Sequence, residues 1–320
     1  MADMRLESYT EKYHHGVIEC LRRNFGWMGE ATEDEVSGWA SPILSYKWSA
    51  ETDVTDDEYK YRHGAVLLDG ERVVGYFGMI LARRGDGSSS YLLGSPTTWV
   101  IDEDYRFHFF DIVGKILDDS VRWIELTPRK SVAESLKKLY GFEHFGFKQF
   151  RLIPFPVEKD DYEVNLVKNA SEIRDEIIKR EFVDHSTLSG IRLIRIICKQ
   201  TNEESFVFYK VFDEDSTRIR ILKITDPVMF AKGCSEIIWK IYKSEFYPDL
   251  GGSDVLVKIM DGLYNREKLC VECDDFLLKG QELVHALIKE KDVTRLCRLM
   301  NANEDIDLLY TESALLDYRI

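Results

Sequence analysis

Residues 95–142 constrain the fold more than any other part of this 320-residue sequence. Residues 95–101 are apolar and β-branched, which indicates a strand buried on both faces. Residues 102–106 form a polar turn whose acids favour a helix start, and residues 107–120 carry apolar side chains at helical spacing. A strand followed by a crossover helix and a second strand predicts two strands that lie parallel or splayed in one sheet.

The second half of this stretch continues the same pattern. Residues 121–126 alternate like a strand, and Thr127 with Pro128 opens another helix. Gly141 stands where a C-cap glycine belongs, and Phe142 returns the chain to the core. After the first strand, backbone N–H groups would face outward at a helix N-terminus, an arrangement that suits a diphosphate or another anion.

This stretch resembles the GNAT acetyltransferase superfamily. In that family a strand ends in an apolar-Asp/His-Pro-x-Tyr-Arg turn, a glycine-rich loop holds the coenzyme A pyrophosphate, and a later helix ends in Gly-Phe. Residues 101–106 read Ile-Asp-Glu-Asp-Tyr-Arg here, with Glu103 in place of the proline. The later helix has four family positions in register: Ala133, Leu136, Gly141 and Phe142.

The resemblance implies an α/β (α+β) fold with two tandem GNAT-like domains, residues 1–155 and 156–320. Each domain would be a mixed, splayed central sheet flanked by helices. A hairpin around Asp69 and Gly70 precedes the motif, as the family order requires, and Gly75 with Gly78 indicates a bulge or a close ligand approach.

The second half repeats the element order loosely, after a linker punctuated by Pro154 and Pro156. Its pattern predicts, in order, a helix over 171–184, a strand or short helix over 191–198, a hairpin over 205–212 and 218–225, a helix from Asp226, strands over 254–259 and around Cys270, a helix from Gln281, and a closing strand over 305–310.

The cofactor loop departs from the family pattern, so we interpret it as degenerate. Phe109 and Asp111 stand where the family has glycines, which are used there because a Cβ obstructs the phosphates. An aspartate also repels a phosphate, by about 1 kcal/mol at 4 Å in water. Lys130 replaces the family asparagine and Lys137 replaces a tyrosine near the cofactor thiol, and either lysine is a candidate for holding a phosphate.

The resemblance implies acyl transfer from acetyl-CoA or another acyl-CoA to an amine. The positions that would bind this cofactor are Val100, Ile101, Arg106, Phe107, His108, Phe109, Lys130 and Lys137. Deprotonating the amine needs a general base, for which Asp102 is a candidate, as is Thr98 acting through a water. Tyr105 and Tyr140 are candidates for the general acid, with packing as the alternative role of each.

Three hypotheses stay open on these residues. The first is an N-acyltransferase acting on a small amine or amino sugar, in a pathway such as polysaccharide biosynthesis, where proteins resembling this one occur. The second is a non-catalytic GNAT-fold binding or scaffolding protein that has lost coenzyme A binding. The third is an unrelated α/β protein. Whether the chain is an enzyme is therefore not decided by the sequence.

Composition excludes several other classes. A net charge of −14 argues against a nucleic-acid partner, and no apolar run approaches a membrane span. Residues 1–10 are polar rather than a secretory signal, so we expect a cytoplasmic protein with reduced thiols. Cys270 and Cys273 form a lone CxxC without a second ligand pair, so we expect no metal site. The expected partner is the small-molecule amine, and the oligomeric state is open.

Overall fold

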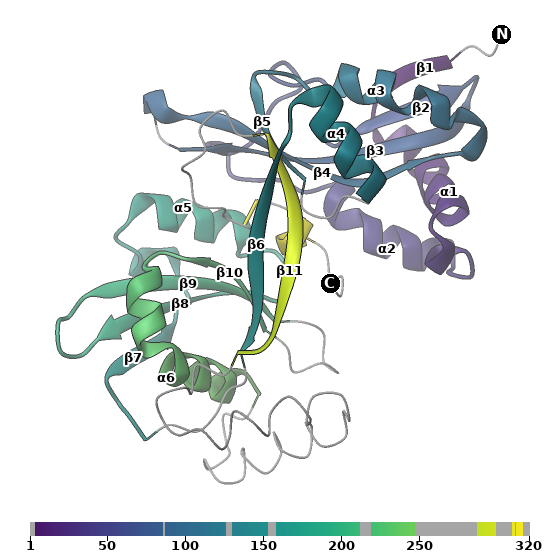
Figure 1. Cartoon of the computed structure of the whole chain (residues 1–320). Helices are drawn as coiled ribbons and strands as arrows, with labels where there is room; N and C mark the ends of the chain where they lie inside the picture. Colours follow the sequence, from purple (N-terminus) through teal and green to yellow (C-terminus); the bar gives the residue numbers. More distant parts are fainter. Residues whose placement is uncertain are drawn as a thin grey trace. The chain divides into compact units, whose positions relative to one another are not determined.

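The structure is a computed structural model that describes residues 4–85, 87–125, 130–152, 158–211, 219–246, 287–298, 309–310 and 312–315. The chain divides into two compact units (Figure 1). The first unit comprises Met1–Phe145, Val183–Leu188 and Thr294–Ile320, and the second comprises Gly146–Phe182 and Ser189–Val293.

A mixed seven-stranded sheet organises the first unit, to which β6 contributes residues 143–145 and β11 residues 294–298. Its strands are β1 (Met4–Ser8), β2 (Ala65–Asp69), β3 (Arg72–Arg84), β4 (Tyr91–Ile101), β5 (Val121–Glu125), β6 (Glu143–Leu152) and β11 (Leu287–Arg298). Their order across the sheet is β1-β2-β3-β4-β5-β11-β6. The β4–β5 pair is parallel, whereas β1–β2, β2–β3, β3–β4 and β5–β11 are antiparallel. The predicted α+β fold with a mixed central sheet, entered through a hairpin and a strand-helix-strand-helix unit, is confirmed.

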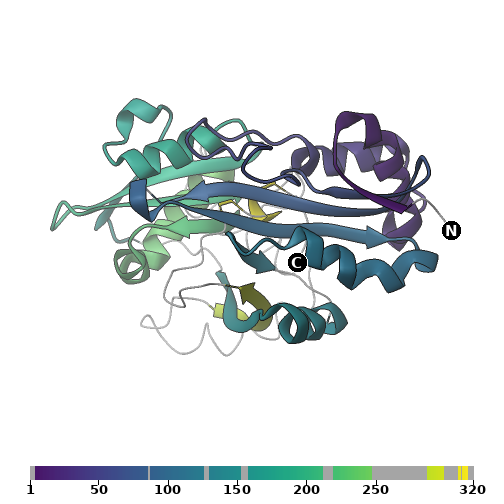
Figure 2. The same ribbon diagram turned by 90° about the horizontal axis from the view of Figure 1, so that it is seen from above.

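Helices cover both faces of this sheet (Figure 2). On one face lie α1 (His14–Asn24) and α2 (Glu33–Leu44), whose apolar sides pack on residues such as Val66 and Tyr76. On the other lie α3 (Phe109–Ile116) and α4 (Lys130–Tyr140). Short 3₁₀ turns complete the unit: η1 (Glu11–Tyr13), η2 (Gly26–Met28), η3 (Gly87–Ser89) and η4 (Glu103–His108), with α9 (Glu312–Leu315) near the chain end.

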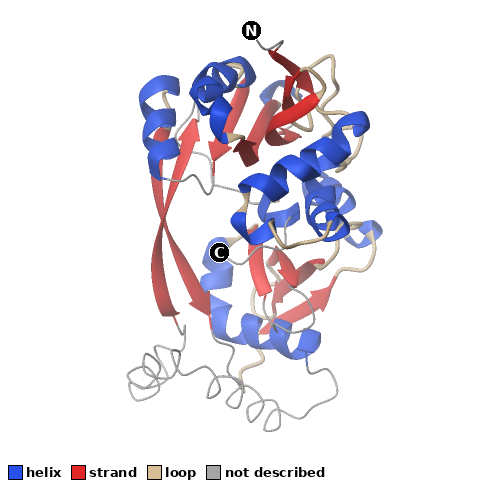
Figure 3. Ribbon diagram, turned by 90° about the vertical axis from the view of Figure 1, so that its right-hand side faces the viewer, coloured by secondary structure: helices blue, strands red, loops and turns tan. Residues whose placement is uncertain are grey.

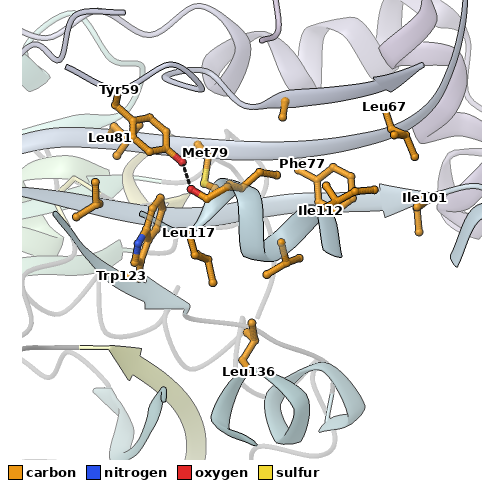
Figure 4. Packing of buried hydrophobic residues seen from close by; sticks show 14 of the residues in the cluster. Tyr59, Leu67, Phe77, Met79, Leu81, Ile101, Ile112, Leu117, Trp123 and Leu136 are labelled. Carbon is orange, nitrogen blue, oxygen red and sulfur yellow. Dashed lines mark hydrogen bonds between the residues drawn. The ribbon is translucent and has the colours of Figure 1, made fainter. Parts of the chain in front are cut away.

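The larger core lies between the sheet and α3 and α4 (Figure 4). Trp123 and Phe77 are fully buried there, and Leu136 brings α4 into the same cluster. The hydroxyl of Tyr59 donates a hydrogen bond to the carbonyl of Ile116, so the end of α3 is tied to the segment before β2. This core fixes α3 beside β4 and β5, where the predicted site lies.

Strand β11 comes from far along the chain and lies beside β6 in the sheet (Figures 1 and 3). Its last residues, Leu296 to Arg298, pair with Glu125 to Trp123 of β5. The pattern predicts a helix from Gln281, but residues 287–298 form this strand. Pairing on both sides outweighs the local preference, because sheet propensity depends strongly on neighbours.

Segments 183–188 and 309–315 also belong to the first unit. The buried carboxylate of Asp184 accepts hydrogen bonds from the hydroxyls of Thr52 (2.7 Å) and Tyr310 (2.5 Å). The Nε2 atom of His185, a residue with no exposed surface, lies 2.7 Å from the carbonyl oxygen of Leu309. The first unit is therefore assembled from three separate parts of the chain.

The second unit has an antiparallel sheet of four strands in the order β10-β9-β8-β7. These strands are β7 (Tyr162–Leu166), β8 (Ile191–Cys198), β9 (Glu204–Val211) and β10 (Ile219–Ile224), accompanied by η5 (Ala170–Glu172), most of α5 (Glu176–His185) and α6 (Pro227–Phe246). The predicted hairpin β9–β10 and the helix that follows it are confirmed. Apolar residues of α6 such as Ile237 pack on Ile196 and Val207.

Several predictions fall on residues that the structure does not describe. The strand over 254–259, the strand around Cys270 and the boundary between residues 155 and 156 lie outside the described residues. Of the predicted closing strand, only Leu309 and Tyr310 are described, and they form a turn. The tandem arrangement of two GNAT-like domains and its boundary stay predictions.

Candidate functional site

Strands β4 and β5 pair over only three residues each. Leu92 to Gly94 lie opposite Val121 to Trp123, and the pairing ends there. From Ser95 to Ile101, β4 pairs with β3 alone among the described strands. We call this edge of β4, from Ser95 to Ile101, the open edge. It contains Thr98, Val100 and Ile101, three of the predicted site residues.

Two neighbouring residues mark where the strands separate. The indole ring of Trp123 packs against Gly94, leaving no room for a side chain at that residue, and its Nε1 donates to the carbonyl of Asp118 at 2.9 Å. The next residue, Ser95, is fully buried, and its Oγ has no hydrogen-bond partner among the described residues. A buried hydroxyl without a partner is uncommon in folded proteins.

The open edge carries a bulge at its centre. Between Tyr76 and Gly78 of β3 the register shifts by one extra residue of β4. Thr98 lies in that bulge with φ of 57°, a left-handed conformation that is strained for a β-branched side chain. A Cβ at Gly78 would lie 2.5 Å from the carbonyl oxygen of Thr97, so the predicted bulge near Gly78 is confirmed. Such strain concentrates at functional sites, which favours a role for this bulge.

The turn after β4 is closed by its own hydrogen bonds. Residues Glu103–His108 form the 3₁₀ helix η4, in which the N–H of Tyr105 donates to the carbonyl of Asp102 at 2.9 Å. At its end the N–H of Phe109 donates to the carbonyl of Arg106. These amides belong to the turn that the resemblance assigns to the pyrophosphate. These two N–H groups are therefore engaged within the turn and are not free for a phosphate.

Phe109 lies in the core rather than at a phosphate. Its ring centroid is 5.8 Å from that of Phe77 and 5.9 Å from that of Trp99. The Nε1 of Trp99 donates to the carbonyl of Gly78 at 2.9 Å, so this aromatic group is anchored to β3. The position where the family has a glycine is therefore used here to pack α3 on the sheet.

The charges of the turn also disfavour a diphosphate. Glu103, Asp104 and Asp111 are exposed acids at or beside the start of α3. The predicted phosphate partner Arg106 is 61% exposed and lies 3.5 Å from the carboxylate of Glu103. Within the turn and the first turn of α3 these three acids outnumber Arg106, so the turn itself does not fit the pyrophosphate of coenzyme A.

Asp102, the predicted general base, is held by three side chains. Its Oδ2 accepts from Arg72 at 2.8 Å and from Arg23 at 3.0 Å, and its Oδ1 accepts from Asn24 at 2.8 Å. Its side chain is 12% exposed. The carboxylate is therefore already engaged by two guanidinium groups and one amide. Nearby, burial and the charge of Asp102 raise the pKa of the Cys20 thiol to about 12.

The two tyrosine candidates both donate to nearby oxygens. The Tyr105 hydroxyl donates to the carboxylate of Asp69 at 2.5 Å, and this bond raises the pKa of Tyr105. The Tyr140 hydroxyl donates to the carbonyl of Phe110, and burial followed by the charge of Asp111 raises the pKa of Tyr140. The first bond ties the turn to β2 and the second ties α4 to α3. Catalysis by Tyr105 stays a prediction.

The other predicted binding residues do not converge on one point. Val100 and Ile101 are buried and pair with β3. Phe107 is 75% exposed and its ring lies against that of His108, with centroids 3.9 Å apart. Lys130 begins α4, and Lys137 is exposed in its last turns. The cofactor role of these residues therefore stays a prediction.

A hollow of about 300 Å³ lies at the C-terminal end of β4. The residues that line it are Arg23, Asn24, Arg72, Asp102, Glu103, Asp104, Tyr105 and Arg106. Sequence reasoning missed the first three of these residues. No local pattern marks them, because they reach Asp102 from α1 and β3 rather than from neighbouring residues.

The described part of the chain shows neither a metal-binding cluster nor a membrane-spanning helix. Within it, no group of His, Cys, Asp and Glu side chains is arranged to hold a metal ion. None of its helices combines the length and the apolar composition that crossing a membrane requires.

No protein-family model and no curated protein matches this sequence. Similar solved structures include a probable N-acyltransferase from Enterococcus faecalis V583 (10% identity, TM-score 0.40) and GCN5-related N-acetyltransferases from Kribbella flavida (11%, 0.40) and Anabaena variabilis ATCC 29413 (10%, 0.41). The similarity covers 75%, 76% and 75% of this chain, respectively. The chain spans 62% of the length of each of the three.

Proposed function

We propose that this protein, whose first unit is built on a GNAT-type mixed sheet, is an N-acyltransferase that moves an acyl group from a thioester to a small amine. An amino sugar is the acceptor class that we favour, as in polysaccharide assembly. The open edge of β4 is the observation that carries the proposal. Ser95 to Ile101 pair on one side only, and an extended ligand with amide groups can pair with such an edge.

An acyl-CoA would supply the acyl group as a thioester. The chain's own residues would orient it and keep water away. The backbone of Val100 and Ile101 would bind the amides of the pantetheine arm. Asp102, Tyr105 and Tyr140 are bonded away from the open edge, whereas Thr98 lies on it, with its Oγ1 3.1 Å from the Oγ1 of Thr97. The Thr98 hydroxyl would position a water that passes the amine proton to the departing thiolate as the N–C bond forms and the C–S bond breaks.

A second candidate function is favoured by the closed turn. Since η4 uses its amides internally and carries exposed acids, the chain would also be consistent with a GNAT-fold binding protein that has lost coenzyme A binding. The two candidates differ in one measurable property, which is whether a thioester donor is bound and consumed.

The test is amine-dependent release of free thiol from acetyl-CoA, measured over a panel of small amines and amino sugars. Thr98→Gly removes the hydroxyl at a residue whose φ suits glycine, so the variant should fold and lose most of the thiol release. Asn202→Gly is the matched control, because Asn202 has φ of 58° in the second unit. Absence of both binding and thiol release in the unmodified protein would exclude the transferase and favour the second candidate.

A further inference from the structure

We infer that this site recognises its acyl donor through the pantetheine arm and the acyl group, and not through the nucleotide diphosphate. The donor class is therefore a pantetheine thioester, whether the arm belongs to free coenzyme A or is attached to a carrier protein. This inference rests on the proposed function and specifies the donor of the same site.

The first step of the argument is the hydrogen bonding of the turn. A diphosphate at a helix start is held by backbone N–H groups that point toward it and have no other acceptor. In η4 the N–H groups of Tyr105 and Phe109 donate to the carbonyls of Asp102 and Arg106. A phosphate would have to break these bonds to gain either of these two N–H groups.

The second step is charge. The turn and the first turn of α3 carry Glu103, Asp104 and Asp111, and the side chain of Arg106 already lies 3.5 Å from Glu103. The hollow beside the turn adds Arg23 and Arg72, but both donate to Asp102. With Asp111 included, a diphosphate would meet four acids and three arginines. A neutral pantetheine arm meets no such repulsion, because its amides and methylenes carry no charge.

The third step concerns the exposed apolar side chains beside the turn. Phe107 is 75% exposed, Phe110 is 37% exposed, and Leu139 on α4 is 54% exposed. The bond from the Tyr140 hydroxyl to the Phe110 carbonyl holds the end of α4 next to the start of α3. Apolar groups therefore stand around a turn that phosphate groups occupy in the family pattern.

The fourth step is the open edge, which keeps the features that an arm needs. Its backbone is unpaired by any other described strand from Ser95 to Ile101, and Ser95 Oγ is buried without a partner. Both features lie along β4, which ends at Ile101 directly before the turn. The unpaired backbone offers both donors and acceptors, which match the amides of a pantetheine arm, whereas a fully ionised phosphate only accepts hydrogen bonds.

The test is a set of dissociation constants from calorimetry on the full chain, at two salt concentrations. The ligands are acetyl-CoA, S-acetyl-pantetheine, ADP as the diphosphate alone, and acyl carrier protein loaded with an acetyl group. We expect S-acetyl-pantetheine to bind within about threefold of acetyl-CoA, with little salt dependence, and millimolar ADP not to displace either thioester. Comparing the loaded carrier protein with S-acetyl-pantetheine identifies which source of the arm binds more tightly.

A preference of more than about thirtyfold for acetyl-CoA over S-acetyl-pantetheine, or displacement by ADP, would overturn the inference while leaving the proposed function standing. Failure of both thioesters to bind would overturn the inference together with the proposed function. Asp111→Asn gives an independent readout, because it should strengthen acetyl-CoA binding and leave S-acetyl-pantetheine unchanged. Asp56→Asn, a change at an exposed loop residue, is the control and should alter neither.

Discussion

The indole of Trp123 packs so closely on Gly94 that a Cβ at residue 94 would lie 2.3 Å from ring atom Cζ3. This contact sits at the last paired position of β4 and β5, directly before Ser95. Because Trp123 is fully buried, the ring has no free space into which it can move. Gly94 therefore sets how closely the two strands approach before they separate.

Gly94→Ala should destabilise the protein by about 1–3 kcal/mol, since overpacking a filled core forces side chains off their rotamers. Urea unfolding followed by tryptophan fluorescence measures the change. Gly38→Ala is the control: it lies on an exposed part of α2 with no atom within 4 Å of the new Cβ, and should stabilise by about 0.5–1 kcal/mol. Equal stability of the two variants would contradict the close contact.

Asp102→Asn should lower the free energy of unfolding by about 1–2 kcal/mol, because it weakens the bonds from Arg23 and Arg72 that join α1 and β3 to the end of β4. This loss lies at the lower end of what hydrogen bonds between charged groups contribute, because Arg72 is 61% exposed and water screens its charge. Glu103→Gln changes an 84% exposed carboxylate and should cost less than about 0.5 kcal/mol. Loss of thiol release without loss of stability in Asp102→Asn would instead indicate a general base.

The pH dependence of stability should contain a contribution from His63. Burial, followed by the charge of Arg62, lowers the pKa of His63 to about 4 from 6.5. Between pH 6.5 and 4 the unfolded chain therefore binds a proton that the folded chain does not, and the free energy of unfolding falls as the pH is lowered. The effect is on the order of 2–3 kcal/mol.

His63→Gln should flatten the stability curve between pH 6.5 and 4, whatever its effect at pH 7. His15→Gln is the control, because the contribution of His15 to stability should depend on pH in the opposite direction. A hydrogen bond to Glu33 raises the pKa of His15, so the stability it adds is complete below pH 6.5 and is lost as the pH rises through the raised pKa. An unchanged slope in His63→Gln would show that His63 takes up its proton in the folded state.

Cys297→Pro should abolish cooperative unfolding or lower its midpoint strongly. Residue 297 lies in β11, which is bonded to β5 on one side and β6 on the other, and proline removes an N–H that a central strand needs. Cys297→Val keeps the backbone donor and should retain most of the stability. Circular dichroism during urea unfolding compares the two, and similar curves would contradict the central position of β11.

The sequence correctly predicted features that depend on neighbouring residues, namely a helix C-cap and a strand bulge. Gly141 has φ of 66°, the left-handed value expected of a glycine C-cap, and the bulge at Gly78 follows from a glycine within a strand. Residues 107–120 were predicted as one helix, whereas α3 spans only Phe109–Ile116 after the 3₁₀ turn η4. Both the alpha and the 3₁₀ geometries satisfy the same apolar spacing over one or two turns.

Long-range pairing could not be predicted in this way. Asp102 meets Arg23 from 79 residues earlier and Arg72 from 30 residues earlier, and nothing in the local composition marks either partner. The position of β11 in the sheet could not be predicted for the same reason, because a periodic pattern does not say which distant strand β11 will join. The prediction of Asp102 as a free base depended on the family position alone.

The position of β11 bears on how this protein is synthesised. Strands β5 and β6 have left the ribosome long before β11, which completes the sheet between them, has been translated. At ordinary translation speeds this delay is on the order of ten seconds. During that interval the facing edges of β5 and β6 lack their partner and are open to pairing with other nascent chains. The number of residues between β6 and β11 should therefore determine how long the nascent chain needs a chaperone to protect these two edges.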